Sequence, residues 1–385
     1  MTELDQIYAV WRDCFAQGES GVLATVVRVE GSTYRRAGAR LLLTSGGKRV
    51  GSVSGGCLEA DLVKKAWWLT GSGEAAIRKY DTTVEGDIAQ EFGLGCNGII
   101  HVLLERLEAG LVSPLTVVPV VKRLRQPGFL ATAIAGSGAA TARVGQRWVQ
   151  WPDGTVETDF AAKALGDFAR SASLTVQKAS VVTYEDDSGA VDLFIEPIWP
   201  TLRLLVFGAG DDAIPLVRLA KFMGYEVIVL DGRSHLARVE RFTGADRVVV
   251  TREDDPFGGL AVDDWTAAVV MSHSYNQDLA SVRALARYHL PYLGLLGPRK
   301  RTERLLGEAN VALDELGGAL HSPIGLDIGA DGAEQIALAI VAEIQSVLNR
   351  RAGGRLREKA GPLHVPPADE AGRNVSYRRP AACPM

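Results

Sequence analysis

Residues 204–213 constrain the fold of this chain more than any other segment. They read Leu-Leu-Val-Phe-Gly-Ala-Gly-Asp-Asp-Ala, which is an apolar strand, a Gly-x-Gly turn and a helix start, with alanine at the third position of the dinucleotide fingerprint. The next apolar run, 227–230, ends in Asp231, which stands 21 residues after Gly210. A carboxylate at this distance accepts hydrogen bonds from a ribose in dinucleotide-binding domains. The sequence therefore predicts a Rossmann-type parallel sheet in which Gly208, Gly210 and Asp231 contact a nucleotide.

Short apolar runs and helical patterns alternate from residue 200 onward, as they do in parallel α/β sheets. The predicted strands cover residues 202–207, 225–230, 247–250, 267–272 and 292–297, and a long amphipathic helix covers 332–350. The N-terminal half reads differently. It has a predicted helix at 2–17, strands at 22–30, 40–44, 115–124, 131–134 and 191–198, and helices at 57–69 and near 160–170.

These patterns predict an α/β protein in which an N-terminal α+β domain is followed by a Rossmann-type domain. The proline-punctuated segment 196–200 marks the boundary, so we assign residues 1–199 to the first domain and 200–351 to the second. Residues 352–385 are rich in Arg, Gly, Pro and Ala without periodicity, and are predicted to be disordered.

Three polar loops lie beside the predicted strand ends of the second half. They occupy residues 271–278, 294–301 and 323–330. Ligands of open α/β sheets bind outside the carboxyl ends of the strands, so we expect these loops to converge on the nucleotide crevice. His273 is a candidate general acid/base, although a structural histidine is the alternative and no acid/base partner is evident. Arg299 and Asp327 are candidate cofactor-binding residues, Arg299 with a plain charged helix start as the alternative.

Asp211 and Asp212 follow the glycine turn, where a pyrophosphate would meet the helix N-terminus. Carboxylates here favour the helix dipole but would repel a bound phosphate. They argue against ordinary tight NAD binding, or for binding through a metal or other backbone amides.

Two cysteines of the N-terminal half are set in glycine. Cys57 follows Ser-Gly-Gly and precedes a predicted helix, and Cys96 follows Gly-Leu-Gly. A thiolate is favoured at a helix start, and successive amides in such turns form an anion-binding concavity. We therefore predict Cys57 and Cys96 as catalytic residues, with two core-filling thiols as the alternative. The predicted cofactor-binding residues of this half are Ser54, Gly55, Gly56, Gly95 and Arg35. Arg35 lies in a loop with two adjacent arginines, for which a solvated surface loop is the alternative.

Bulk properties narrow the class of protein. The chain has 385 residues, a formal net charge of −4 and 47% hydrophobic residues, so it lacks the basic footprint of a nucleic-acid binder. Its four cysteines include no C-x-x-C pair, which argues against a zinc ribbon and a disulfide framework. We read no signal peptide and no membrane span, and we expect a cytoplasmic protein.

The glycine-cysteine loops and the later strand-end loops together resemble the xanthine dehydrogenase accessory factor (XdhC/CoxI) family. The resemblance rests on residues 51–59, 93–98, 206–210, 273–278, 294–299 and 323–330. The chain departs from the family at two positions. Asp211 stands where members often have histidine, and Pro298 where they usually have serine.

The resemblance implies a non-enzymatic maturation factor. Members are thought to bind molybdenum cofactor, to support its sulfuration with a cysteine desulfurase, and to deliver it to a xanthine dehydrogenase-type molybdenum hydroxylase. Cys57 and Cys96 would face the molybdenum or carry sulfur, and the cofactor would be molybdopterin with or without a cytosine dinucleotide. The resemblance and the apolar-striped terminal helix also imply a homodimer, although the helix could equally cover the sheet of its own subunit.

Two other classes of function stay open at this point. An NAD(P)-dependent oxidoreductase would use the Gly-x-Gly turn, Asp231 and His273, but would leave both glycine-cysteine loops without a role. A nucleotide-sensing scaffold is the third class. The sequence does not decide which target enzyme is served or which cysteine carries sulfur.

Overall fold

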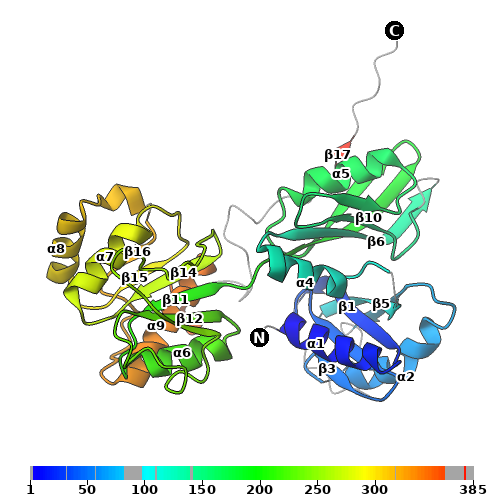
Figure 1. The fold of residues 1–385 in the computed structure, drawn as a ribbon. Coiled ribbons are helices and arrows are strands. Elements are labelled where there is room, and N and C mark those ends of the chain that lie inside the picture. The colour runs from blue at the N-terminus through cyan, green and yellow to red at the C-terminus, as the bar shows by residue number, and fades with distance from the viewer. Residues whose placement is uncertain are drawn as a thin grey trace, which may run out of the picture. The chain divides into compact units, whose positions relative to one another are not determined.

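The computed structural model describes residues 3–31, 33–56, 58–81, 98–108, 111–138, 142–316 and 318–359, and the backbone of 377–378. It divides into two compact units, one that runs from Glu3 to Pro200 and takes in the 377–378 backbone, and one that begins at Thr201 (Figure 1). We call them the N-terminal unit and the Rossmann unit, and each is described by itself. In the described part of the chain, no helix is both long enough and apolar enough to cross a membrane.

The Rossmann unit is built on a parallel sheet with the strand order β13-β12-β11-β14-β15-β16. Its strands are β11 (Arg203–Phe207), β12 (Glu226–Asp231), β13 (Arg247–Val250), β14 (Thr266–Val270), β15 (Leu293–Leu295) and β16 (Leu320–His321). This is the doubly wound order of dinucleotide-binding sheets, in which the chain reverses direction across the sheet between β11 and β14. The Rossmann prediction is confirmed. Two predicted strands end early, because β14 stops at Val270 and β15 at Leu295 where the polar loops begin.

Helices cover both faces of this sheet (Figure 1). They are α6 (Ala213–Phe222), α7 (Tyr275–Leu285), α8 (Arg299–Ala309) and α9 (Ala333–Leu348), with 3₁₀ turns η1 (Leu313–Leu316) and η2 (Leu356–Glu358). Side chains of β11 alternate between the faces, as the pleat requires. Leu204 and Val206 pack with α6 and α9, and Leu205 and Phe207 pack with α7 and α8.

The first sheet of the N-terminal unit is antiparallel, in the order β3-β2-β1-β5-β4. Its elements are β1 (Gly21–Gly31), β2 (Arg40–Thr44), β3 (Arg49–Gly51), β4 (Ala76–Asp81) and β5 (Gly98–Leu107), with helices α1 (Glu3–Ala16) and α2 (Glu59–Leu69). Leu62 and Ala66 of α2 bury the face of β1 that carries Val22. Ile7 of α1 packs on the opposite face against Leu23.

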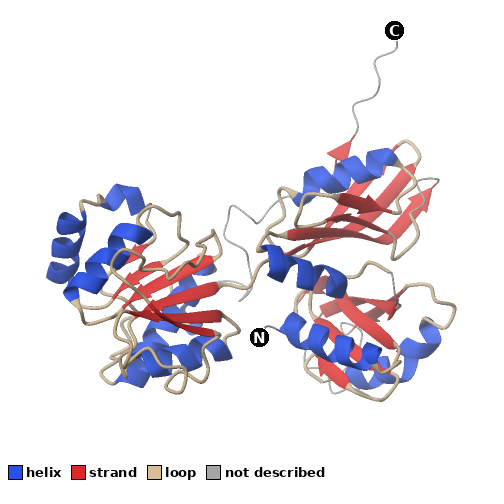
Figure 2. Ribbon diagram, in the orientation of Figure 1, coloured by secondary structure: helices blue, strands red, loops and turns tan. Residues whose placement is uncertain are grey.

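The second sheet of the N-terminal unit, whose strands are red in Figure 2, has the order β17-β9-β10-β6-β7-β8. Its elements are β6 (Gly128–Gly138), β7 (Arg147–Gln150), β8 (Val156–Thr158), β9 (Ser180–Asp186), β10 (Gly189–Ile198) and β17 (Tyr377–Arg378), with helices α4 (Pro114–Leu124) and α5 (Lys163–Ser173). The C-terminal segment 352–385 was predicted to be disordered. Most of it lies outside the described residues.

The two sheets of this unit are joined by apolar packing and by ion pairs. Val27 and Leu103 of the first sheet pack against Ile134 and Phe194 of the second. Arg40 of β2 pairs with Glu196 of β10, and both side chains are more than nine-tenths buried. A buried pair of this kind costs several kcal/mol if one partner is removed, so it fixes the two sheets together.

The predicted strand at 115–124 is wrong, because this segment forms α4. Ser113 and Thr116 cap the helix start, with the Ser113 amide donating to Thr116 Oγ1 over 3.0 Å, and Pro114 occupies the first helical turn. The buried positions Val117, Val118 and Val121 follow a helical period. The β-branched composition of this run concealed that period.

Candidate functional site

The glycine turn after β11 approaches the chain that leaves β14. Gly208 has φ +133°, and a Cβ built on it would lie 2.5 Å from the carbonyl oxygen of Met271. A side chain is excluded here by both the backbone angle and the contact. The Gly208 amide donates to the Leu230 carbonyl at 2.8 Å. Glycine is therefore required at this position to close the sheet at its switch point.

Asp231 lies at the end of β12 with a side chain that is 0% exposed. Its Oδ1 accepts from the Arg233 amide at 2.8 Å and from Arg233 Nε at 2.9 Å. Its Oδ2 accepts from the Ala209 amide at 2.8 Å and from Arg233 Nη2 at 2.6 Å. Burial works against ionisation of Asp231, but the hydrogen bonds from Arg233 and Ala209 outweigh it and lower the pKa of this carboxyl. The carboxylate that was predicted to accept from a ribose is fully bonded within the protein.

His273 stands directly after β14 with a left-handed backbone, at φ +57°. A histidine in this region is strained, and such strain is found most often at functional sites. The imidazole is 60% exposed, and its Nε2 lies 2.7 Å from Asp212 Oδ2. The sequence offered no partner for His273. The strand order supplies one, since β11 and β14 are neighbours and α6 begins beside the end of β14.

Asp211 and Asp212 are both paired with basic side chains, which reduces the repulsion of a bound phosphate that the sequence alone suggested. Asp211 is 95% exposed and bonds to Arg241 at 2.6 Å, and Asp212 bonds to His273. Arg241 also donates to the Ala209 carbonyl at 2.6 Å. The acidic character predicted for the phosphate position is therefore offset by a guanidinium, and by an imidazole when His273 is protonated.

Asp278 of α7 forms a second buried carboxylate network, with Ser272 and Arg301. Its carboxylate accepts from the Ser272 hydroxyl at 2.5 Å and from Arg301 at 2.5 Å. Burial raises the pKa of Asp278, and the bonds from Ser272 and Arg301 oppose that rise. Arg301, rather than the predicted Arg299, is brought into the site. The helical phase of α8 is the signal, because Arg301 lies one turn before the buried Leu305.

Two other predicted residues of this half stand apart from these networks, and a third, Gly210, adjoins one of them. Arg299 is exposed at the first position of α8, and Asp327 is exposed in the loop before α9. Gly210 lies beside the His273 ring, with 3.9 Å between a Cβ built on the glycine and His273 Cδ2.

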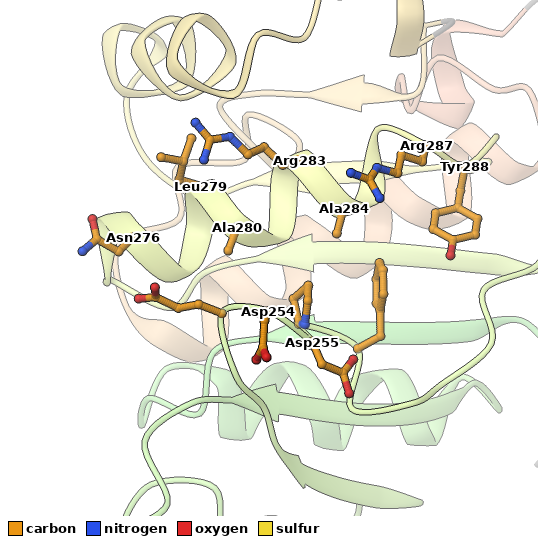
Figure 3. A pocket seen from close by; sticks show the side chains of 12 residues that line it. Asp254, Asp255, Asn276, Leu279, Ala280, Arg283, Ala284, Arg287 and Tyr288 are labelled. Atoms are coloured by element: carbon orange, nitrogen blue, oxygen red, sulfur yellow. The ribbon is translucent and has the colours of Figure 1, made fainter.

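Two adjoining cavities open along α7, beside the carboxyl ends of β11, β12 and β13. The inner one, of about 360 Å³, is lined by Phe207, Leu230, Gly232, Arg233, Thr251, Arg252, Glu253, Pro256, Ser272, Gln277, Ala280 and Ser281. The outer one, of about 530 Å³, lies between α7 and the loop that carries Asp254 and Asp255 (Figure 3). Glu253, Pro256 and Ala280 border both.

In the N-terminal unit, the predicted glycine-cysteine loop is anchored by a residue that the sequence analysis missed. The Glu59 carboxylate, at the first position of α2, accepts from the amides of Val53 and Ser54 at 3.0 Å and of Gly56 at 2.9 Å. It also accepts from the hydroxyls of Ser52 and Ser54. Burial alone would raise the pKa of Glu59, but these bonds lower it to about 2. The only sequence signal was an acidic residue at a predicted helix start.

This loop presents its glycines to the surface. Gly55 and Gly56 are exposed with φ of +87° and +126°, and Tyr34 packs against Gly55. Arg35, predicted to bind an anion, is paired with Glu3, whose other carboxylate oxygen accepts from the Ser52 amide at 3.3 Å. Ser54 and Gly56, predicted to offer amides to a ligand, donate them to Glu59. Cys57, Gly95 and Cys96 lie outside the described residues.

An α+β unit followed in the chain by a Rossmann unit defines the class of this protein. A profile described as the XdhC Rossmann domain matches residues 204–344, and one described as the XdhC and CoxI family matches residues 14–81. A protein described as a probable xanthine dehydrogenase subunit, from Bacillus subtilis (strain 168), is 34% identical over 337 residues, 85% of this chain and 92% of that protein. The chain belongs to the XdhC and CoxI family.

Two further relatives extend over most of the chain. "Molybdenum cofactor insertion chaperone PaoD" from Escherichia coli (strain K12) is 25% identical over 342 residues, 87% of this chain and 86% of that protein. A crystal structure described as a xanthine dehydrogenase from Bacillus halodurans superimposes with a TM-score of 0.74 at 28% identity, covering 91% of this chain and 97% of that chain.

Proposed function

We propose that this protein is a maturation factor that binds molybdenum cofactor and delivers it to a xanthine dehydrogenase-type molybdenum hydroxylase. The observation that carries the proposal is the match, over 87% of the chain, to a protein named as a molybdenum cofactor insertion chaperone. Membership of the XdhC and CoxI family supports the same role. In this proposal the molybdenum cofactor is cargo, and a cysteine desulfurase supplies the sulfur for its sulfuration.

The loop before α2 is the proposed contact with the cargo. Glu59 holds residues 52–56 in one conformation, and Cys57 is the next residue in the sequence. Exposed glycines allow a large planar ligand to approach the main chain closely. A thiolate is a soft ligand that suits molybdenum better than it suits Mg²⁺ or Ca²⁺. A thiol is also the group that would carry a transferred sulfur. We assign Cys57 and Cys96 to this contact.

In the same proposal, the crevice of the Rossmann unit holds a nucleotide, either the cytosine dinucleotide part of the cofactor or a free nucleotide. Gly208 and Gly210 form the turn, and the cavity along α7 offers room for a base and a ribose. We further propose a cytoplasmic homodimer. Light scattering at micromolar concentration tests the dimer, and a monomeric mass would exclude it.

An NAD(P)-dependent oxidoreductase is the second candidate, because one observation favours it. The exposed His273 with its Asp212 partner at the switch point is an arrangement suited to general acid/base catalysis. Hydride turnover with NADPH, abolished by His273→Ala, would support this candidate over the maturation factor.

The experiment that tests the proposed function measures molybdenum and pterin bound to the purified protein, and activation of a molybdenum hydroxylase. Cys57→Ala or Cys96→Ala is expected to lower both. Cys14→Ala is the matched control, because Cys14 is a buried thiol of α1 that lies outside the loop. Equal cofactor content and activation in the wild type and both loop variants would refute the role of these cysteines.

A further inference from the structure

The inner cavity along α7 differs from an NAD-type ribose site in what it offers to a ligand. In an NAD-type site, the carboxylate at the end of the second strand accepts from the ribose diol. Here that carboxylate, Asp231, has no exposed surface. Each of its oxygens already accepts two hydrogen bonds, which use all the acceptor positions of a carboxylate. A ribose diol therefore finds no acceptor at Asp231.

Where an NAD-type site offers a carboxylate acceptor to the ribose, this cavity offers the guanidinium donors of Arg233. Its Nε and Nη2 bind the two oxygens of Asp231, and Nη2 also donates to the Ser272 carbonyl at 2.8 Å. Among the described residues, none accepts from its Nη1, and the side chain is 32% exposed where it lines the cavity. A guanidinium fixed through one edge presents its remaining N–H groups in a set direction, which suits a phosphate oxygen.

The other arginine of the cavity does not share this arrangement. Arg252 is 78% exposed and is paired with Asp254, itself 69% exposed. This pair is bidentate, but it is exposed to solvent, so it contributes little free energy and holds its guanidinium less firmly than a buried carboxylate does. Arg233 is thus the cationic group of the cavity wall that is positioned by a buried carboxylate.

The remaining walls suit a nucleoside. Phe207, Leu230, Pro256 and Ala280 give an apolar surface for the face of a base. Gln277 is oriented by the Gly232 amide, which donates to its Oε1 at 3.1 Å, so its amide nitrogen is left as a donor. A volume of about 360 Å³ lies within the range of small-molecule pockets.

We infer that this cavity binds a nucleotide that carries a phosphomonoester on its ribose, and that Arg233 is the residue that recognises that phosphate. The inference rests on the nucleotide crevice of the proposed function and selects a free nucleotide for it, because the cytosine dinucleotide part of the cofactor has a free ribose diol. It does not depend on whether the protein carries molybdenum cofactor.

The test is calorimetric titration of the purified protein with two ligands of equal phosphate count. 2′,5′-ADP carries a ribose phosphomonoester, and 5′-ADP carries a free ribose diol. We expect 2′,5′-ADP to bind at least about tenfold more tightly, since a charge-assisted hydrogen bond from Arg233 Nη1 to the phosphomonoester is worth that factor or more. NADP⁺ and NAD⁺ are expected to differ in the same direction. Equal affinity for the two ligands, tighter binding of 5′-ADP, or binding of neither would overturn the inference.

Variants assign the preference to Arg233. Arg233→Lys keeps the charge and loses the planar fork, so the preference for 2′,5′-ADP is expected to fall to about threefold or less. Arg233→Gln alone would leave Asp231 buried without its partner, so the neutral double variant Asp231→Asn/Arg233→Gln is measured as well, with folding checked by circular dichroism. Arg218→Gln is the control, because Arg218 is an exposed arginine of α6 that does not line the cavity. A preference that survives in the folded double variant would exclude Arg233 as the recognising residue.

The two proposals fail in different measurements. Loss of the nucleotide preference with normal molybdenum and pterin content would overturn this inference and leave the proposed function intact. A retained preference for 2′,5′-ADP in a protein that binds no molybdenum and no pterin would overturn the cofactor role and leave the phosphate site intact.

Discussion

Replacement of Glu59 by glutamine is the sharpest test of how the loop before α2 is held. The carboxylate accepts hydrogen bonds from three amides and two hydroxyls of residues 52–56. Its pKa falls from 4.5 to about 2 in the folded protein. Allowing for its partial exposure, that difference corresponds to about 2–3 kcal/mol of stability at neutral pH. Glutamine keeps the shape but places an NH₂ group against some of these donors, so we expect a loss of this size.

The pH dependence of the loss has a defined sign. Because folding lowers the pKa of Glu59, its contribution is fully present above the unfolded value of 4.5 and is lost as the pH falls toward 2. The wild type is therefore expected to be more stable than Glu59→Gln at pH 7, with the difference shrinking between pH 4.5 and pH 2.

Urea unfolding followed by circular dichroism at pH 7, 4 and 3 measures this difference. Glu185→Gln is the matched control, because Glu185 is an exposed glutamate of β9 in the same unit. The rate at which iodoacetamide alkylates Cys57, with Cys14, Cys96 and Cys383 replaced by alanine, reports the loop itself and is expected to change in the variant. A stability difference below about 0.5 kcal/mol at pH 7, the usual range of surface changes, would refute the reasoning.

Three further predictions concern the Rossmann unit. Gly208→Ala is expected to destabilise this unit by more than about 1 kcal/mol, because φ is +133° and the new Cβ would meet a backbone oxygen; thermal unfolding measures it. Arg301→Ala leaves Asp278 buried without its cation and is expected to lower the free energy of unfolding by about 3 kcal/mol. Arg299→Ala is expected to change it little, because Arg299 is exposed, and denaturant titrations of both variants measure the difference. His273→Gly relieves a left-handed histidine and is expected to retain or gain stability, while changing any proton-transfer activity; unfolding and turnover assays separate the two effects.

The fold could be predicted from the sequence where one pattern dominated. Residues 204–213 combine a buried strand, a glycine turn and a helix start, and these local signals agree with the parallel sheet that forms around β11. The prediction failed at α4, where valines and a proline obscured a helix that is fixed by its cap and its buried face. Local composition and tertiary packing pointed to different structures there, and packing prevailed.

The candidate site was harder to predict because its partners are distant in sequence. Asp212 and His273 are 61 residues apart, and they meet because β11 and β14 are neighbours. Asp231 was predicted correctly as the end of its strand, but its saturation by Arg233 depends on side-chain geometry that no spacing rule encodes. Glu59 lies close to its partners in sequence, yet nothing in the pattern distinguished it from an ordinary acidic residue in a first helical turn.

The position of β5 in the first sheet decides how this protein can be dissected. β5 lies between β1 and β4, and β4, at the edge of the sheet, joins it by pairing with β5. A fragment that ends at residue 81, where the family match of the N-terminal half stops, would remove β5 and leave β4 without its neighbour. Extending the fragment to residue 108 restores the sheet but exposes Val27 and Leu103, which are covered by the second sheet. The smallest piece of this half that retains its own interior therefore runs to Pro200, so chimaeras and truncations of this protein should be cut there.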